Sequence, residues 1–167
     1  MIKKNMLRIF FFILVRMTTP LTPWDYCVVK RLFQHTFLCN EDKNFVKAWK
    51  HRHPTASVGY WVEDALVGAA IVQHKTLEYI FIHPAFQNQG LGTILLNTVL
   101  NNCSTIYLTA VKDQAVRSWY KKHGFEQTGE DTFVRVLNPP NIKKVNGPIS
   151  TPVETEPLMA THGCCIC

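Results

Sequence analysis

The segment Leu77–Leu100 constrains the fold of this chain more than any other stretch of its sequence. It opens as an extended apolar run, is interrupted by a proline, and passes through a short loop that ends in Gly-Leu-Gly at residues 90–92. Leu91, Leu95 and Val99 then recur at helical spacing. A strand, a glycine-containing turn and a helix N-terminus in this order form an anion-binding site, because unpaired N–H groups and the helix dipole point at the turn.

Three nucleotide-binding motifs compete for the glycine loop. A P-loop requires Gly-Lys-Ser/Thr, and here Gly92 is followed directly by Thr93, so that motif is excluded. A dinucleotide fingerprint requires a third glycine, and Leu95 occupies its position. The loop does match Gln/Arg-x-x-Gly-x-Gly/Ala, as Gln87-Asn88-Gln89-Gly90-Leu91-Gly92. This pattern resembles the acetyl-CoA pyrophosphate loop of the GCN5-related N-acetyltransferases, the GNAT superfamily.

A second segment, Asp113–Phe125, carries a further motif. Asp113 is a good N-cap for a helix over residues 114–123, and Gly124 suits the left-handed residue that ends such a helix. The segment resembles the GNAT pattern Asn-x-x-Ala-x-x-x-Tyr-x-x-x-Gly-Phe, with Asp113 in place of the usual Asn. The two motifs follow the family's order, and the resemblance extends over residues 19–138.

The resemblance implies an α/β fold with a central, mixed, mostly antiparallel twisted sheet, splayed in the middle and flanked by helices. It also implies acetyl-CoA as the co-substrate. The loop and the helix start would bind its pyrophosphate, backbone groups on the preceding strand would bind its amide arm, and the second motif would add one polar contact. By resemblance the cofactor-binding residues are Phe81, Ile82, His83, Gln87, Asn88, Gln89, Gly90, Leu91, Gly92, Thr93 and Asp113.

Tyr120 is the predicted general acid. It occupies the position from which the family's tyrosine protonates the leaving thiolate, and a phenol suits that role because its pKa of about 10 lies near that of an alkyl thiol. The alternative is a core aromatic, since Val116, Trp119 and His123 share a helical face with Tyr120.

Glu78 is the predicted base or amine-binding group. Strand alternation predicts that it lies on the side of Ile80 and Ile82, and a carboxylate in an apolar strand needs a reason because burying it unpaired is costly. In polyamine-type GNAT enzymes a carboxylate at this place helps to deprotonate the amine. A structural carboxylate is the alternative.

The other helices and strands are predicted from the periodicity of apolar residues and from the turn-forming residues that interrupt it. The pattern predicts helices over 22–37 and 44–49, a β-hairpin over 57–73 with its turn at Glu63-Asp64, and strands over 77–82, 105–111 and 132–137. Gly68 lies within the second hairpin strand, where a glycine indicates a bulge or a close backbone approach.

Length and charge bound the domain organisation. With 167 residues the chain can form one domain of ordinary size. Much of its net charge of +6 comes from the N-terminal residues Lys3, Lys4, Arg8 and Arg16, and the body is close to balance, so we expect no nucleic-acid partner. We predict a basic and apolar extension (1–17), the GNAT domain (18–138) and a flexible tail ending in cysteines (139–167).

The cysteines indicate a reduced, cytoplasmic protein. Cys27, Cys39 and Cys103 have neither zinc-pair spacing nor a disulfide framework, so we predict no metal site.

The termini leave peripheral membrane association as an alternative. The segment Cys164–Cys167 loosely resembles a prenylation box, and the alternative interpretation is a thiol-rich tail without lipidation. The apolar run Ile9–Val15 is too short to span a bilayer, and a dispensable extension, a targeting segment or a strand all remain open for it.

The sequence thus predicts an N-acetyltransferase that transfers acetyl to a primary amine. Glu78 slightly favours a small amine or polyamine, and a protein lysine or N-terminus is the alternative acceptor. A non-catalytic acyl-CoA-binding module is the alternative class of function. A homodimer remains open as the oligomeric state.

Overall fold

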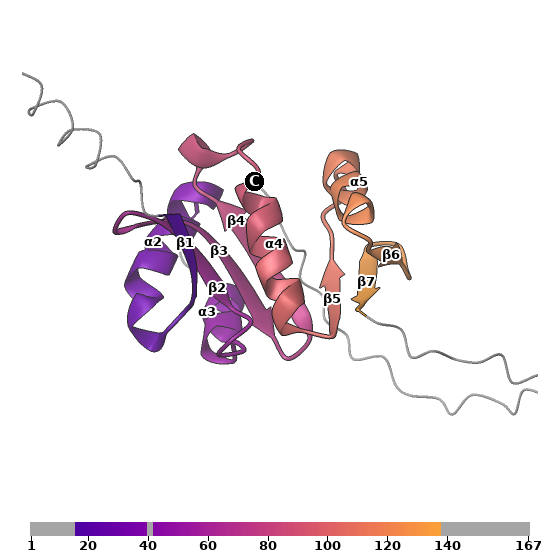
Figure 1. The fold of residues 1–167 in the computed structure, drawn as a ribbon, viewed down its shortest axis with the longest axis horizontal. Helices are drawn as coiled ribbons and strands as arrows, with labels where there is room; N and C mark the ends of the chain where they lie inside the picture. The colour runs from indigo at the N-terminus through magenta and orange to yellow at the C-terminus, as the bar shows by residue number, and fades with distance from the viewer. Residues whose placement is uncertain (1–15, 40–41, 138–167) are drawn as a thin grey trace, which may run out of the picture.

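The structure is a computed structural model and describes residues 16–39 and 42–137 (Figure 1). One seven-stranded sheet has the order β1-β2-β3-β4-β5-β7-β6. Its strands are β1 (Arg16–Pro20), β2 (Val58–Val62), β3 (Ala65–Gln73), β4 (Thr76–Ile82), β5 (Thr105–Thr109), β6 (Glu126–Gln127) and β7 (Thr132–Val136). The helices are α2 (Tyr26–Phe37), α3 (Lys43–Lys50), α4 (Leu91–Asn102) and α5 (Gln114–Lys122), with short 3-10 turns η2 (Pro23–Asp25) and η3 (Pro84–Phe86). This is the predicted α/β fold.

Helices cover both faces of the sheet. Alternate residues of β4 point to opposite sides: Ile80 and Ile82 pack in the cluster that includes α4, whereas Tyr79 and Phe81 pack in the cluster that includes α2 and α3. Figure 1 shows α4 lying across β3 and β4, with α2 and α3 on the other side. Two apolar layers on one sheet explain why β3 and β4 are almost uniformly buried.

The sheet opens in its middle. All neighbouring strands are antiparallel except β4 and β5, which run parallel and pair only at Thr76 and Tyr107. Beyond that point the two strands diverge, and α5 lies beside β5 on the far side of the opening from α4 (Figure 1). The predicted splay of the middle strands is therefore confirmed, and it leaves the β5-facing backbone edge of β4 without a strand partner.

Two register shifts shape β3 and β4. The first lies where Tyr60 pairs with Gly68 and Trp61 pairs with Leu66. The predicted bulge is therefore present beside Gly68. A Cβ on Gly68 would lie 2.5 Å from Ile82 Cδ1, so the close approach at this glycine is made by a side chain rather than by backbone.

The second shift skips Glu78, because Ile71 pairs with Tyr79 and Val72 with Leu77. The strict alternation from which we predicted the side of Glu78 is therefore interrupted at Glu78 itself.

Most predicted elements are present with ends shifted by a few residues. The predicted helix over 22–37 divides into η2 and α2, and Thr22 caps η2 with Asp25, whose Oδ2 accepts from the Thr22 N–H at 2.7 Å. Strands β1 and β6 were not predicted as such, and β1 crosses the predicted domain boundary after residue 17.

The expectations for residues 1–15 and for the tail beyond Leu137 lie outside the described residues. Within 16–39 and 42–137, no helix is long and apolar enough to cross a bilayer.

Candidate active site

A cleft of about 310 Å³ opens between the N-terminus of α4 and the facing side of α5. Its lining combines a polar glycine loop with apolar side chains from β4, η3 and α5. The lining residues are Ile82, Phe86, Gln87, Asn88, Gly90, Leu91, Gly92, Thr93, Ala115, Val116 and Trp119. Seven of them are predicted cofactor-binding residues, so the structure gathers most of the first motif in one place.

The start of α4 presents unpaired donors to this cleft. Gly90 is the N-cap residue and provides no side-chain cap. The N–H of Ile94 donates to the Gly90 carbonyl at 3.2 Å, so the N–H groups of Leu91, Gly92 and Thr93 precede the first bond of the helical ladder. These N–H groups and the positive end of the helix dipole lie where the sequence predicts an anion-binding site, and binding of an anion there stays a prediction.

The two glycines of the loop have different roles. Gly90 has φ +79°, a left-handed conformation, and a Cβ added there would meet no atom within 4 Å, so it would project into open space. Gly92 is helical, and a Cβ there would make an ordinary 3.7 Å contact with Trp119 Cζ2. Only Gly90 therefore requires glycine for its backbone conformation.

Hydrogen bonds hold the loop against β4 and η3. Gln87 Nε2 donates to the Ile82 carbonyl at 3.1 Å, so this side chain both lines the cleft and holds the loop to the strand end. His83 Nδ1 accepts from the Ala85 N–H at 3.2 Å. Gln89 is exposed, bonds the Ala85 carbonyl at 3.4 Å and does not line the cleft.

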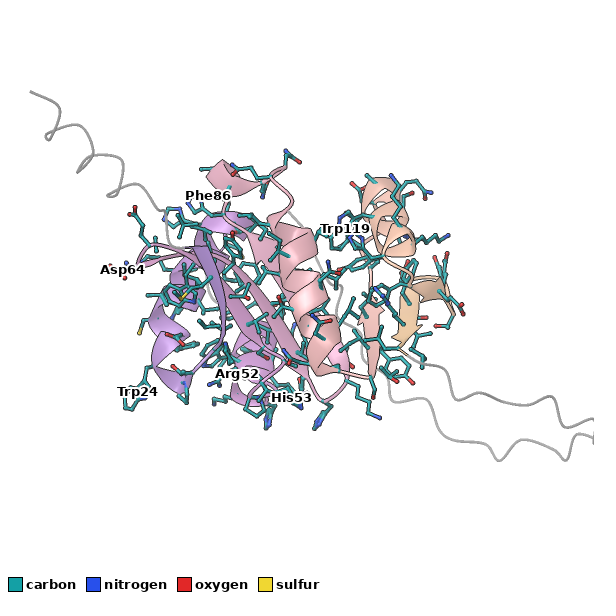
Figure 2. All side chains as sticks on the ribbon, in the orientation of Figure 1. Trp24, Arg52, His53, Asp64, Phe86 and Trp119 are labelled. Atoms are coloured by element: carbon teal, nitrogen blue, oxygen red, sulfur yellow. The ribbon has the colours of Figure 1, made fainter. Side chains whose placement is uncertain are left out.

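The α5 wall holds residues that the sequence analysis did not assign to the cofactor. Asp113 caps the helix by accepting from the N–H groups of Ala115 and Val116, at 2.7 and 3.2 Å, and does not itself line the cleft. Counted from Asp113, the alanine of the family pattern falls on Val116, a second departure from the pattern. Trp119 lies on the side of α5 that faces α4 (Figure 2). The available signal was the helical face that Val116 and Trp119 share with Tyr120, which was weighed only as the core-aromatic alternative for Tyr120.

Tyr120 is fully buried beside the cleft and does not line it. Its ring centroid lies 5.0 Å from that of Trp119, 5.5 Å from Phe125 and 6.3 Å from Phe133. The side chain thus belongs to the core cluster, and its ring contacts that of Trp119, which does line the cleft. This packing fits the core-aromatic alternative and leaves the role of the hydroxyl as a prediction.

The predicted β4 residues occupy three different settings. Ile82 lines the cleft, whereas the Phe81 side chain is fully buried against Phe33 and Phe37 on the α2 side, at 5.7 and 5.8 Å between ring centroids. His83 contacts the rings of His35 and Phe86, each at 5.9 Å. Phe81 can thus contact a cofactor only through its backbone, as predicted, on the edge of β4 that β5 leaves unpaired.

Comparison with known proteins decides the family. A model described as an acetyltransferase (GNAT) domain matches residues 31–138. The chain belongs to the GNAT acetyltransferases.

Solved structures of GNAT enzymes share the fold. Naa50 of Arabidopsis thaliana, in complex with the bisubstrate analogue CoA-Ac-MVNAL, is 21% identical, with 71% of this chain and 95% of that chain covered and a TM-score of 0.56. The ribosomal-protein-S18-alanine N-acetyltransferase of Escherichia coli is 18% identical (74% and 93% covered, TM-score 0.58). A GNAT family acetyltransferase of Brucella melitensis in complex with acetyl-CoA is 12% identical (75% and 90% covered, TM-score 0.51).

The GNAT protein is therefore an acetyltransferase with acetyl-CoA as its co-substrate. The cleft fits that molecule, because three open N–H groups and a glycine loop suit a pyrophosphate, and the apolar wall of Val116 and Trp119 suits a pantetheine arm. Within the described residues, no cluster of histidine, cysteine and acidic side chains could hold a metal ion.

Proposed function

We propose that this GNAT enzyme transfers acetyl from acetyl-CoA to the α-amino group of a peptide N-terminus. The observation that supports it is that α2 and η3, which flank the C-terminal end of β4, carry no carboxylate, so that the acidic side chains at this end are those of the β2–β3 turn, Glu63 and Asp64. The last turns of α2 bring Arg31 and His35 there, and the His35 ring lies 5.9 Å from that of His83, which in turn contacts Phe86 of the cleft. A polyamine requires several carboxylates to bind its ammonium groups, whereas a peptide end presents one amine and a backbone.

The proposed chemistry assigns each step to a group of this chain. Acetyl-CoA supplies the thioester, held by the open N–H groups of Leu91, Gly92 and Thr93. The edge of β4 next to the opening supplies backbone N–H groups that polarise the thioester carbonyl. Glu78 accepts a proton from the incoming ammonium, directly or through water, and the amine nitrogen attacks the carbonyl carbon. The carbon–sulfur bond then breaks, and the Tyr120 hydroxyl donates its proton to the thiolate. The nitrogen gives up its second proton to the Tyr120 oxygen, directly or through water, which forms the neutral amide and restores the phenol.

The structures of relatives support a peptide acceptor. The Arabidopsis Naa50 structure holds an analogue that joins CoA to an acetylated peptide, and the Escherichia coli enzyme acts on the alanine of a ribosomal protein. A small amine or polyamine is the second candidate, and Glu78 is the observation that favours it. The half-buried Glu78 lies mid-strand in β4, within the opening between β4 and β5.

Three separate acceptors distinguish these assignments. The first is a short peptide with a free N-terminus and no lysine. The second has the same sequence with a blocked N-terminus and one internal lysine, and the third is spermidine. Each is incubated with the enzyme and acetyl-CoA, and acetylation is read as a mass increase. We expect acetylation of the first peptide alone. Acetylation of spermidine or of the blocked peptide, without the first, would reassign the acceptor.

A further inference from the structure

A second cavity lies at the opposite end of the sheet from the cofactor cleft. It has a volume of about 370 Å³ and is lined by His53, His74, Lys75 and the segment Asn102–Thr105. Figure 2 shows His53 and Arg52 at the base of the molecule and Phe86 of the cleft at its top. The acetyl-transfer chemistry makes no use of this cavity, which we call the basal pocket.

Hydrogen bonds between distant parts of the chain hold the walls of the basal pocket. Its three sides are the loop after α3, the β3–β4 turn and the end of α4. The bonds are His53 N–H to the Val72 carbonyl (2.6 Å), Asn102 Nδ2 to the Thr55 carbonyl (3.2 Å) and Tyr107 N–H to the Lys75 carbonyl (2.8 Å). A ligand would therefore meet walls that are already fixed in place, which lowers the entropy lost on binding.

The side chains of the basal pocket are mostly hydrogen-bond donors. His53 Nδ1 accepts the Ala56 N–H at 3.3 Å, so its hydrogen resides on Nε2, which can donate. Lys75 contributes an ammonium group, His74 a second imidazole, and Ser104 and Thr105 contribute hydroxyls. Among the described residues, no ion pair involves Lys75.

The basal pocket contains no negative charge. No aspartate or glutamate lies between residues 43 and 62, between 65 and 77, or between 79 and 112, and Glu78 does not line the pocket. Glu63 and Asp64 form the β2–β3 turn, at the other end of β3. Burial raises the pKa of the Cys103 thiol, so this lining residue also stays neutral. Basic and acidic residues are nearly balanced in the body of the sequence, but no acidic side chain lines the basal pocket.

Ordinary structural roles explain only part of this arrangement. Lys50 is the last residue of α3 and His51 is its C-cap, a position where cations are favourable in any helix. His74 and Lys75 form a turn between two strands, and His74 has φ +53°, a left-handed conformation in which histidine, like Asn and Asp, is enriched. The turn therefore accounts for His74, but neither the helix dipole nor the turn accounts for Lys75 beside His53.

From this geometry we infer that the basal pocket binds a phosphate monoester, as a small soluble ligand or as a lipid headgroup. Lys75 and the His53 Nε2–H would donate to the phosphate oxygens, and the hydroxyls of Ser104 and Thr105 would complete the shell. The site is separate from acetyl transfer, so a bound phosphate would leave the cofactor cleft accessible.

The test uses the full chain saturated with CoA, so that the pyrophosphate loop cannot bind the probe. The imidazole NMR signals of the histidines are followed as inorganic phosphate is added at constant ionic strength. We expect saturable shifts of His53 and His74, and roughly tenfold weaker binding in Lys75→Ala. The matched control, Lys122→Ala on exposed α5, should bind phosphate as the wild type does. Unchanged CoA affinity and thermal unfolding would show that Lys75→Ala is folded.

A second arm identifies the source of the phosphate. Sedimentation with phosphatidylcholine vesicles is compared with and without phosphatidic acid, for the wild type and both variants. Lys75-dependent binding to phosphatidic acid would support a headgroup, and Lys75-dependent binding of inorganic phosphate alone would support a soluble ligand. If neither probe binds saturably, or if Lys75→Ala and Lys122→Ala bind equally well, the inference is overturned.

Discussion

Gly90 and Gly92 are separated by one residue in the motif but should respond differently to the same substitution. Gly90→Ala adds a methyl group that meets no protein atom within 4 Å, in the loop that lines the cleft, and strains a backbone with φ +79°. We expect a loss of about 1 kcal/mol of unfolding free energy and at least roughly tenfold weaker acetyl-CoA binding. Calorimetric titration with acetyl-CoA and thermal unfolding measure the two effects.

Gly92→Ala is the matched control. Its backbone is helical, its Cβ would make only an ordinary contact with Trp119, and the loop pattern itself accepts alanine there. Both acetyl-CoA affinity and stability should stay close to wild type. Equal loss of affinity in the two variants would contradict the anion site as described.

Tyr120→Phe tests whether a buried phenol acts in catalysis. If its hydroxyl protonates the thiolate, kcat should fall by about a hundredfold while acetyl-CoA affinity is unchanged. Tyr107→Phe, at an exposed position of β5, should leave kcat unaltered. An unchanged kcat in Tyr120→Phe would show that this tyrosine only packs against Phe125 and Phe133.

Single residues were predictable where a motif encodes a backbone requirement. Gly90, Gly124 and Asp113 have the conformations and caps that their residue types indicate. Phe86 and Trp119 were not assigned to the cleft, because an apolar side chain has no sequence signal that distinguishes a cleft wall from core. Only the fold, which places α5 across the cleft from the start of α4, makes that distinction.

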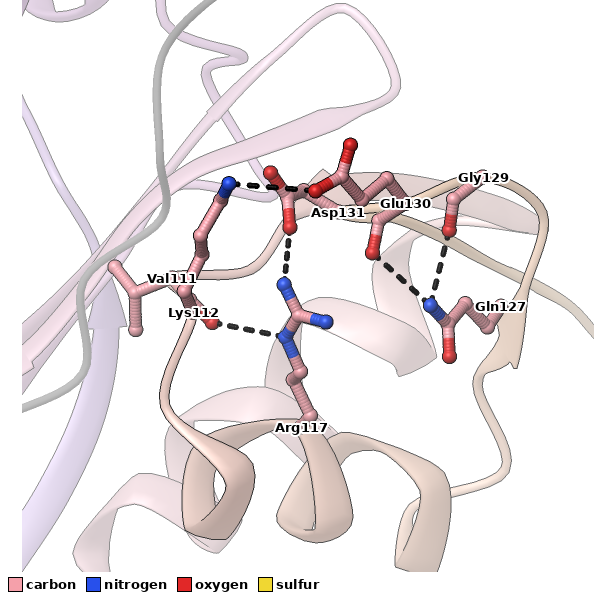
Figure 3. Close-up of polar contacts among 7 residues, drawn as sticks. All are labelled: Val111, Lys112, Arg117, Gln127, Gly129, Glu130 and Asp131. Carbon is pink, nitrogen blue, oxygen red and sulfur yellow. Dashed lines mark hydrogen bonds and ion pairs between the residues drawn. The ribbon is translucent and has the colours of Figure 1, made fainter.

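At the scale of elements, polar contacts join the β5–α5 loop and α5 to the turn between β6 and β7 (Figure 3). Arg117 pairs with Asp131 and its Nε donates to the Val111 carbonyl at 3.2 Å, and both partners of the ion pair are largely buried. Arg117→Ala leaves a half-buried carboxylate without its partner. We expect a loss of about 1–3 kcal/mol of unfolding free energy, measured by urea denaturation.

Lys112→Ala provides the comparison for that loss. Lys112 pairs with Glu130 at 3.3 Å, but both side chains are mostly exposed, so removing it should change stability by at most about 0.5 kcal/mol. Similar losses in the two variants would mean that burial does not determine the strength of these pairs.

Elements with strong periodicity were predictable, and short strands were not. β6 has two residues and β1 ends in proline, and each pairs along its full length with a neighbouring strand, β6 with β7 and β1 with β2. The bulge at Glu78 could not be predicted either, because it arises from the pairing register between β3 and β4 rather than from the sequence of either strand.

In the whole molecule, two sites are separated by the length of the sheet. The opening between β4 and β5 and the start of α4 form the acetyl-CoA cleft at one end, and the basal pocket lies at the other. The fold followed from two motifs because each one fixes a loop and a helix around the opening. The basal pocket could not be predicted, because its residues come from three segments that only the folded sheet brings together.

The central claim is that the cleft turns over acetyl-CoA rather than only binding it. The most direct measurement is mass spectrometry of a mixed pool of amines, amino acids and peptides after incubation with enzyme and acetyl-CoA. Mass detection is preferable to thiol dyes, because six cysteines would add background. We predict products that gain one acetyl group, predominantly on peptide N-termini. Saturable acetyl-CoA binding with no acetylated product in any pool would contradict the account and indicate an acyl-CoA-binding module.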